Sequence, residues 1–197
     1  MKILLIVLSY LLGAFPTGYL LVRRAARKDI REIGSRSTGA TNVLRYGGWK
    51  LAIPVMLVDV LKGFLPVFGA VALFSDRRLA VLSLLVAVIG HCYPVYLKFK
   101  GGKGVATTVG GLLYLAPLPL AISLVITLLV LFSSRYVSLA TLSGLFSFPF
   151  LVLFITGDKF LFWSGWLFFL FILYRHRDNL RRLRAGTERK LGERIHG

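Results

Sequence analysis

Long apolar runs alternate with short basic segments along the chain. A helix that crosses the hydrocarbon core of a bilayer needs about 20 mostly apolar residues. The pattern therefore predicts an all-α, polytopic membrane protein. The runs that we interpret as membrane spans cover residues 3–22, 49–74, 79–97, 136–156 and 160–174, and a further apolar run covers 105–132.

The run at 105–132 has the length of either one long helix or two short ones. A single helix would be about 42 Å long, whereas the hydrocarbon core is roughly 30 Å thick. Two short helices would be separated at Pro117 and Pro119, because proline interrupts a helix from within. The charges that flank the runs decide between these alternatives.

With two helices in this run, the strongly basic segments all fall on one side of the membrane. Nineteen lysines and arginines then share that side, in segments 23–48, 98–104, 133–135 and 175–197. Only four lie on the other side, namely Lys2, Arg77, Arg78 and Lys159. A six-helix arrangement would place the basic tail outside, against the positive-inside rule. We therefore expect one domain over residues 1–197, a bundle of seven transmembrane helices with the N-terminus outside and the C-terminus in the cytoplasm.

Composition narrows the classes of partner. Hydrophobic residues make up 56% of the chain, compared with about 45–50% in soluble domains. The chain has a net charge of +17. Its basic residues flank the apolar spans and do not form one basic domain, which argues against a nucleic-acid partner. Anionic lipid headgroups and phosphorylated substrates are the expected partners. Cys92 is the sole cysteine, so no intrachain disulfide is possible, and no metal or other cofactor is predicted.

A lysine- and glycine-rich loop, Lys98–Gly104, interrupts the apolar sequence and is called the glycine loop below. Glycines let the backbone approach a ligand closely. The run that follows can begin a helix, whose first N–H groups favour an anion. A loop that merely fixes topology would explain the same lysines. We predict a phosphate site formed by Lys100, Gly101, Gly102, Lys103, Gly104 and Thr107.

Two other basic segments carry polar side chains suited to a phosphate or a polyol. The first supplies Ser35, Asn42 and Arg45, although a hydrated loop with helix-capping residues would look similar. The C-terminal tail is expected to be helical up to Gly186. A lipid-binding basic tail is the alternative there, but His176 and Asn179, three positions apart, are expected to face a site together. Arg135 and Ser138 are expected at the rim of the pocket.

Two charged residues lie inside the second apolar run, at helical spacing. Charges at membrane depth usually pair or serve a site, so Asp59 and Lys62 are expected to form an ion pair within one helix. A direct role in substrate binding is the less favoured alternative. His91 could act as a general base, but we favour a neutral ring hydrogen-bonded to backbone.

Together, the three polar segments resemble those of the bacterial acyl-phosphate:glycerol-3-phosphate acyltransferase family (PlsY). Their order and their shared side make the resemblance specific, and it covers most of the chain. Arg36-Ser37, Tyr93 and Tyr96 depart from the usual family residues. The resemblance rests on Gly34-Ser35, Gly39-Ala40-Thr41-Asn42 and Arg45, on Gly90-His91, Pro94 and Phe99–Thr107, and on Arg175-His176, Asn179, Arg182-Leu183, Gly186, Glu188 and Lys190.

The resemblance implies transfer of a fatty acyl group from acyl phosphate to the 1-hydroxyl of glycerol 3-phosphate, giving lysophosphatidic acid and phosphate. It implies a bacterial inner-membrane enzyme whose active site faces the cytoplasm. Acyl phosphate is already activated, so no covalent acyl-enzyme is needed. The catalytic pocket is predicted to contain Ser35, Arg45, Lys103, His176 and Asn179, with Lys103 and Arg45 holding phosphates.

The proton of the attacking hydroxyl needs an acceptor. Dense positive charge would weaken His91 or His176 as a base, so we expect the phosphate of the acyl phosphate to accept it. Two other classes of function remain open. A transporter or flippase would use Asp59, Lys62 and broken helices, whereas a lipid-binding scaffold would leave the clustered polar residues without a purpose.

Overall fold

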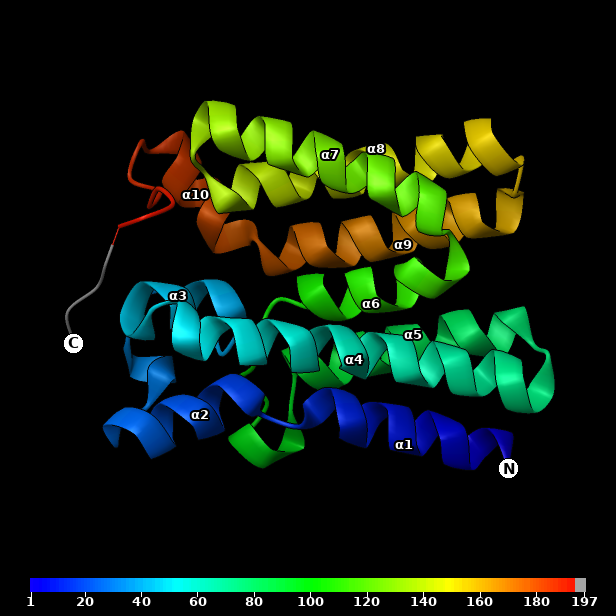
Figure 1. Cartoon of the computed structure of the whole chain (residues 1–197), viewed down its shortest axis with the longest axis horizontal. Coiled ribbons are helices and arrows are strands. Elements are labelled where there is room, and N and C mark those ends of the chain that lie inside the picture. Colours follow the sequence, from blue (N-terminus) through cyan, green and yellow to red (C-terminus); the bar gives the residue numbers. More distant parts are fainter. Residues whose placement is uncertain (194–197) are drawn as a thin grey trace. The chain divides into compact units, whose positions relative to one another are not determined.

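The computed structural model describes residues 1–193, and these contain helices but no strand. The all-α prediction is thus confirmed for this part of the chain. The residues form two compact units, Met1–Leu115 and Ala116–Glu193, and Figure 1 labels their helices. The first unit contains α1 (Lys2–Ala14), α2 (Thr17–Ala26), η1 (Ile30–Glu32), α3 (Ala40–Gly47), α4 (Trp49–Phe74), α5 (Arg77–Cys92), η2 (Val95–Leu97) and α6 (Val105–Leu115). The second contains α7 (Pro117–Ser134), α8 (Val137–Thr156), α9 (Lys159–Arg175) and α10 (Arg177–Arg184).

Five segments in residues 1–193 are long and apolar enough to cross a membrane. The shorter apolar helix α6 has 11 residues, or about 17 Å at 1.5 Å per residue. Helix α9 has 17 residues, or about 26 Å. The five longer segments are Lys2–Ala26, Trp49–Phe74, Arg77–Leu97, Pro117–Ser134 and Val137–Thr156.

The first apolar run is not one continuous helix, contrary to expectation. Helix α1 ends at Ala14 and α2 begins at Thr17, with Phe15 extended at ψ 119°. Pro16 causes the break, because proline lacks an N–H and disfavours helical backbone in the residue before it. The two helices still make up a single apolar segment of 25 residues.

The predicted division of the run at 105–132 is confirmed. Helix α6 ends at Leu115 and α7 begins at Pro117, where proline fits the first helical position. The third span, expected over residues 79–97, lies within the apolar segment Arg77–Leu97. In this segment α5 ends at Cys92, and Pro94 precedes η2.

The first unit is held together by close backbone contacts between apolar helices. At Gly63 on α4, an added Cβ would overlap the carbonyl of Thr107 on α6. Small residues allow membrane helices to approach in this way, because packing drives their association. Substitution of Gly63 would force α4 and α6 apart.

The ends of the first unit differ in chemistry. Lys2 Nζ pairs with Asp76 Oδ2 at 2.8 Å, which places the N-terminus beside the turn between α4 and α5. The polar segment 27–48 lies towards the other end, and its Arg31 contacts Leu97 of η2, just before the glycine loop. The predicted substrate residues of this unit therefore come from two segments that are joined by this contact.

In the second unit, α7, α8 and α9 pack side by side. Ser123 Oγ on α7 donates to the Gly144 carbonyl on α8 at 2.6 Å. Phe146, Phe150, Trp166 and Phe169 join α8 to α9 through edge-to-face ring contacts. Such contacts stabilise aromatic packing beyond simple burial.

Candidate active site

The glycine loop folds back onto the end of α5. The Gly101 N–H donates to the Cys92 carbonyl at 3.2 Å, and the Gly102 N–H donates to the His91 carbonyl at 3.0 Å. A Cβ at Gly102 would overlap the His91 ring, and Gly104 has a φ of +86°. The loop can follow this path only with glycine at these positions.

These internal bonds change which groups the loop offers to an anion. The N–H groups of Gly101 and Gly102, expected to face a phosphate, are used within the protein. The first hydrogen bond of α6 runs from the Thr108 N–H to the Gly104 carbonyl at 2.9 Å. The N–H groups of residues 105–107 therefore precede the helical ladder and suit an anion.

Of the predicted side chains near the glycine loop, Lys100 is exposed and Lys103 is half-buried. Thr107 is fully buried in the first turn of α6. Its hydroxyl has no hydrogen-bond partner among the described residues. A buried polar group without a partner is uncommon and calls for an explanation.

A buried charge cluster lies beneath the glycine loop. Lys62 Nζ contacts Asp59 Oδ1 at 2.6 Å, which confirms the predicted ion pair within one helix, and both residues are 2% exposed. His91 Nδ1 lies 3.6 Å from the same carboxylate oxygen. The sequence did not reveal that His91 would join this pair, since the two helices meet only through tertiary packing.

The first polar segment is organised around Asn42. The Ser35 N–H donates to Asn42 Oδ1 at 3.0 Å. Asn42 Nδ2 donates to the carbonyls of Ile30, Ile33 and Ser37 at 3.2, 3.0 and 2.9 Å. The Asn42 amide therefore fixes the loop that contains Ser35, and its contact with substrate stays a prediction. Arg45, on α3, is 8% exposed.

In the second unit, Glu188 brings together residues from α8 and α10. It accepts hydrogen bonds from Ser138 Oγ at 2.8 Å, Asn179 Nδ2 at 2.6 Å and Arg182 Nε at 2.8 Å. Glu188 was not among the residues predicted for the catalytic pocket. Gly186, with a φ of +68°, ends α10 and turns the chain back, and the Thr187 N–H bonds the Arg182 carbonyl at 2.8 Å. The helix end predicted at Gly186 was therefore the sequence feature that indicated this turn, which brings Glu188 back to α10.

Glu188 remains ionised despite its burial. Desolvation raises the pKa of the Glu188 carboxyl, but its three hydrogen-bond donors together hold the pKa below its ordinary value. A buried carboxylate in this state orients the Asn179 amide and the Ser138 hydroxyl. Arg135, which was also predicted at the rim, is exposed and donates to the Leu191 carbonyl at 3.2 Å.

His176 lies at the junction of α9 and α10 and is 3% exposed. Its Nδ1 lies 2.9 Å from the Ile172 carbonyl. A carbonyl oxygen only accepts, so Nδ1 carries a proton in this contact. In a neutral ring, Nε2 is then the acceptor nitrogen.

The structure brings some predicted residues together within each unit. Ser35 meets Asn42 in the first, and the loop glycines meet His91. Asn179 and Ser138 meet at Glu188 in the second. Within residues 1–193, no group of three His, Cys, Asp or Glu side chains could hold a metal ion.

Comparison with known proteins identifies close relatives. A family model described as glycerol-3-phosphate acyltransferase matches residues 3–186. The glycerol-3-phosphate acyltransferase of Fusobacterium nucleatum is 40% identical over 94% of this chain and 95% of its own. The one from Thermus thermophilus is 44% identical over 96% of this chain and 95% of its own.

Two solved structures of PlsY (YgiH), an integral membrane glycerol 3-phosphate acyltransferase, have the same fold. The glycerol 3-phosphate form has a TM-score of 0.91 at 35% identity, covering 97% of this chain and 96% of that chain. The lysophosphatidic acid form has a TM-score of 0.88 at 34% identity, covering 98% and 96%.

Proposed function

Because this chain belongs to the glycerol-3-phosphate acyltransferase family, we propose that it transfers a fatty acyl group from acyl phosphate to the 1-hydroxyl of glycerol 3-phosphate. The products are lysophosphatidic acid and phosphate. The observation that carries the proposal is the full-length match to PlsY, whose two structures are glycerol 3-phosphate and lysophosphatidic acid forms. These are the acceptor and the acylated product of such a transfer.

Acyl phosphate is the donor that fits the polar groups of the chain. Its phosphate suits the N–H groups at the start of α6, the Lys103 ammonium and the buried Arg45 guanidinium. The unpartnered Thr107 hydroxyl, buried in the same turn, can donate to a phosphate oxygen. An activated donor also needs no nucleophilic side chain, and the single cysteine, Cys92, is buried.

The reaction proceeds in one displacement. The 1-hydroxyl oxygen attacks the acyl carbonyl carbon, and the bond between that carbon and the phosphate oxygen breaks. The hydroxyl proton passes to the departing phosphate, which leaves as hydrogen phosphate. Cationic and N–H donors stabilise the developing oxyanion and the leaving group. His176 orients glycerol 3-phosphate through a hydrogen bond and does not take up the proton.

Replacing His176 by glutamine tests the route of the proton. Glutamine retains a hydrogen-bonding group but cannot act as a base near neutral pH. We expect a slower reaction whose pH–rate profile keeps the ionisations of the unmodified enzyme. Loss of all turnover with recovery on adding imidazole would instead identify His176 as the base.

Purified protein in detergent tests the proposed activity. We expect radiolabelled glycerol 3-phosphate to be acylated when acyl phosphate is supplied, with phosphate released in equal amount. Acylation only with acyl-coenzyme A would overturn the donor assignment. Movement of glycerol 3-phosphate across liposomes without any product would favour the transporter.

We further propose seven membrane segments, with the active site facing the cytoplasm of a bacterial inner membrane. The Lys2–Asp76 pair supports this, since it joins the two parts of the first unit assigned to the outside. The charge asymmetry of the connecting segments supports the same orientation. In this arrangement the short α6 and the longer α7 are the fourth and fifth segments.

Cysteine labelling in intact cells tests this orientation. The native Cys92 is buried, so introduced thiols give the signal. We expect Arg36→Cys and Arg184→Cys to react only with a membrane-permeant reagent, because both residues would face the cytoplasm. Arg77→Cys should react with an impermeant reagent added outside. Protection of Arg77→Cys from that reagent would reverse the topology.

A further inference from the structure

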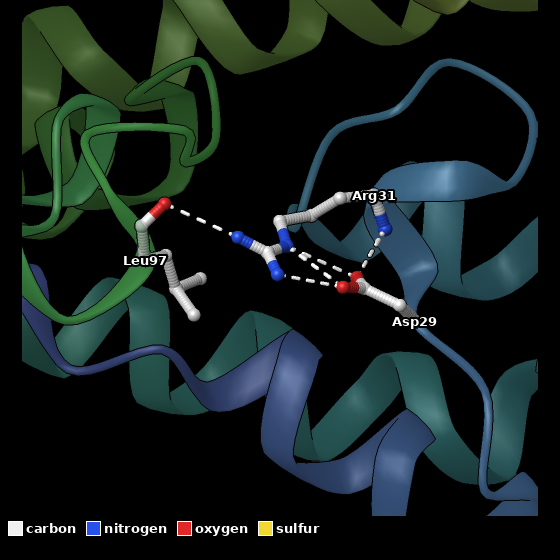
Figure 2. A network of polar contacts seen from close by, with 3 residues as sticks. All are labelled: Asp29, Arg31 and Leu97. Carbon is white, nitrogen blue, oxygen red and sulfur yellow. Dashed lines mark hydrogen bonds and ion pairs between the residues drawn. The ribbon is translucent and has the colours of Figure 1, made fainter.

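Arg31 joins the first polar segment to Leu97, the residue directly before the glycine loop, which is called the stem of the loop below (Figure 2). Its Nη1 donates to the Leu97 carbonyl at 3.1 Å. Its Nε and Nη2 donate to the two oxygens of Asp29, at distances between 2.6 and 3.1 Å. Arg31 also lies 5.0 Å from the centre of the Tyr19 ring, so its guanidinium is held on three sides.

The carbonyl that Arg31 binds is where the glycine loop begins. Leu97 is the last residue of η2, and Lys98 and Phe99 follow it with φ values of +53° and +61°. Two successive left-handed residues that are not glycine are unfavourable and persist only where their surroundings fix them. The Leu97 carbonyl also accepts the Lys100 N–H at 3.2 Å. Arg31 therefore reinforces a carbonyl that takes part in closing this turn.

The short helix η1, which contains Arg31, also contacts the loop of Ser35. The carbonyl of its neighbour Ile30, together with that of Ile33, accepts the Asn42 amide that fixes Ser35. The same segment thus anchors the loop that presents Ser35 and, through Arg31, the stem of the glycine loop.

The pairing persists at neutral pH. The hydrogen bond from Arg31 lowers the pKa of the Asp29 carboxyl, which outweighs the effect of its burial. The side chains of Arg31 and Asp29 are 23% and 17% exposed, so substitution there leaves no deep cavity. The contact can therefore be removed without disrupting a membrane span.

We propose that Arg31, held by Asp29, is a positioning residue that keeps the glycine loop in the form that binds the phosphate of a substrate. Arg31 itself does not touch substrate. The proposal rests on the proposed function for its choice of ligand, but the contact on which it depends can be tested without any activity.

The central variant is Arg31→Met, with Arg24→Met as its matched control. Arg24 is exposed on α2, and its replacement makes the same change in charge. We expect Arg31→Met to raise the KM for acyl phosphate about 3- to 10-fold, the effect of one lost hydrogen bond. Its kcat should change less. The KM of Arg31→Lys should lie between those of Arg31→Met and the unmodified enzyme, because lysine keeps the charge but not the fork of donors.

Trypsin supplies a readout that needs no catalysis. Lys98 and Lys100 are exposed in the loop, and cleavage after them reports local opening. We expect Arg31→Met to be cleaved there about 3- to 10-fold faster, with an unchanged unfolding temperature. Cleavage and KM equal to those of Arg24→Met would overturn the proposal. A lowered unfolding temperature with faster cleavage throughout the chain would also overturn it, since Arg31 would then be a general stabilising residue.

If the unmodified protein shows no acyl transfer, the proposed function fails but the trypsin comparison still decides the role of Arg31.

Discussion

Replacing Lys103 by methionine is expected to lower acyl transfer about 10- to 150-fold while the protein remains folded in detergent. Methionine keeps much of the length of the side chain and removes its charge. A lost charge-assisted contact to phosphate costs about 1.5–3 kcal/mol, and each 1.4 kcal/mol is about a factor of ten. Lys103 is half-buried beside the start of α6, where a phosphate would also meet the first N–H groups of that helix. Initial rates at saturating and limiting substrate measure the effect.

Lys98→Met is the matched control for this variant. Lys98 lies in the same loop but is exposed and comes before the glycines. Its replacement should change the rate by no more than about twofold, the size expected for a screened surface charge. Equal rates for Lys103→Met and the unmodified enzyme would refute the anion-binding role of the glycine loop.

The second large effect concerns stability. Lys62→Met should lower the free energy of unfolding by about 3–5 kcal/mol, because it leaves the buried Asp59 carboxylate without its partner. Lys62 Nζ and Asp59 Oδ1 are 2.6 Å apart, and both residues are almost completely buried. Thermal unfolding in detergent, followed by circular dichroism, measures the loss.

The double variant Asp59→Asn, Lys62→Met separates pairing from packing. It removes both charges, so it should recover a large part of the stability lost in Lys62→Met. His91, 3.6 Å from Asp59, remains near the neutral amide. A double variant less stable than Lys62→Met would show that the pair contributes through something other than mutual compensation.

Local features of the fold were predictable from the sequence. The break between α6 and α7 follows from Pro117, and the end of α10 from Gly186. The Asp59–Lys62 pair follows from a spacing of three residues on one helix. Each depends on residues that are neighbours along the chain, which is what propensity and periodicity describe.

The roles of Asn42 and Glu188 depend on distant parts of the chain. Asn42 binds carbonyls up to 12 residues away, and Ser138 lies 50 residues from Glu188. No periodicity connects such positions. Every residue has a backbone carbonyl, so residue type does not indicate which carbonyl will accept a given hydrogen bond. The break between α1 and α2 could have been predicted from Pro16, but the continuous hydrophobicity of the first run led us to expect one helix.

The bonds that hold Gly101 and Gly102 on the end of α5 have a thermodynamic consequence. Since the loop takes its shape from the protein's own carbonyls, its ordering entropy is lost during folding and not when substrate arrives. Phosphate binding should then have a small unfavourable conformational entropy, and its association rate should depend on diffusion and charge more than on rearrangement of the loop.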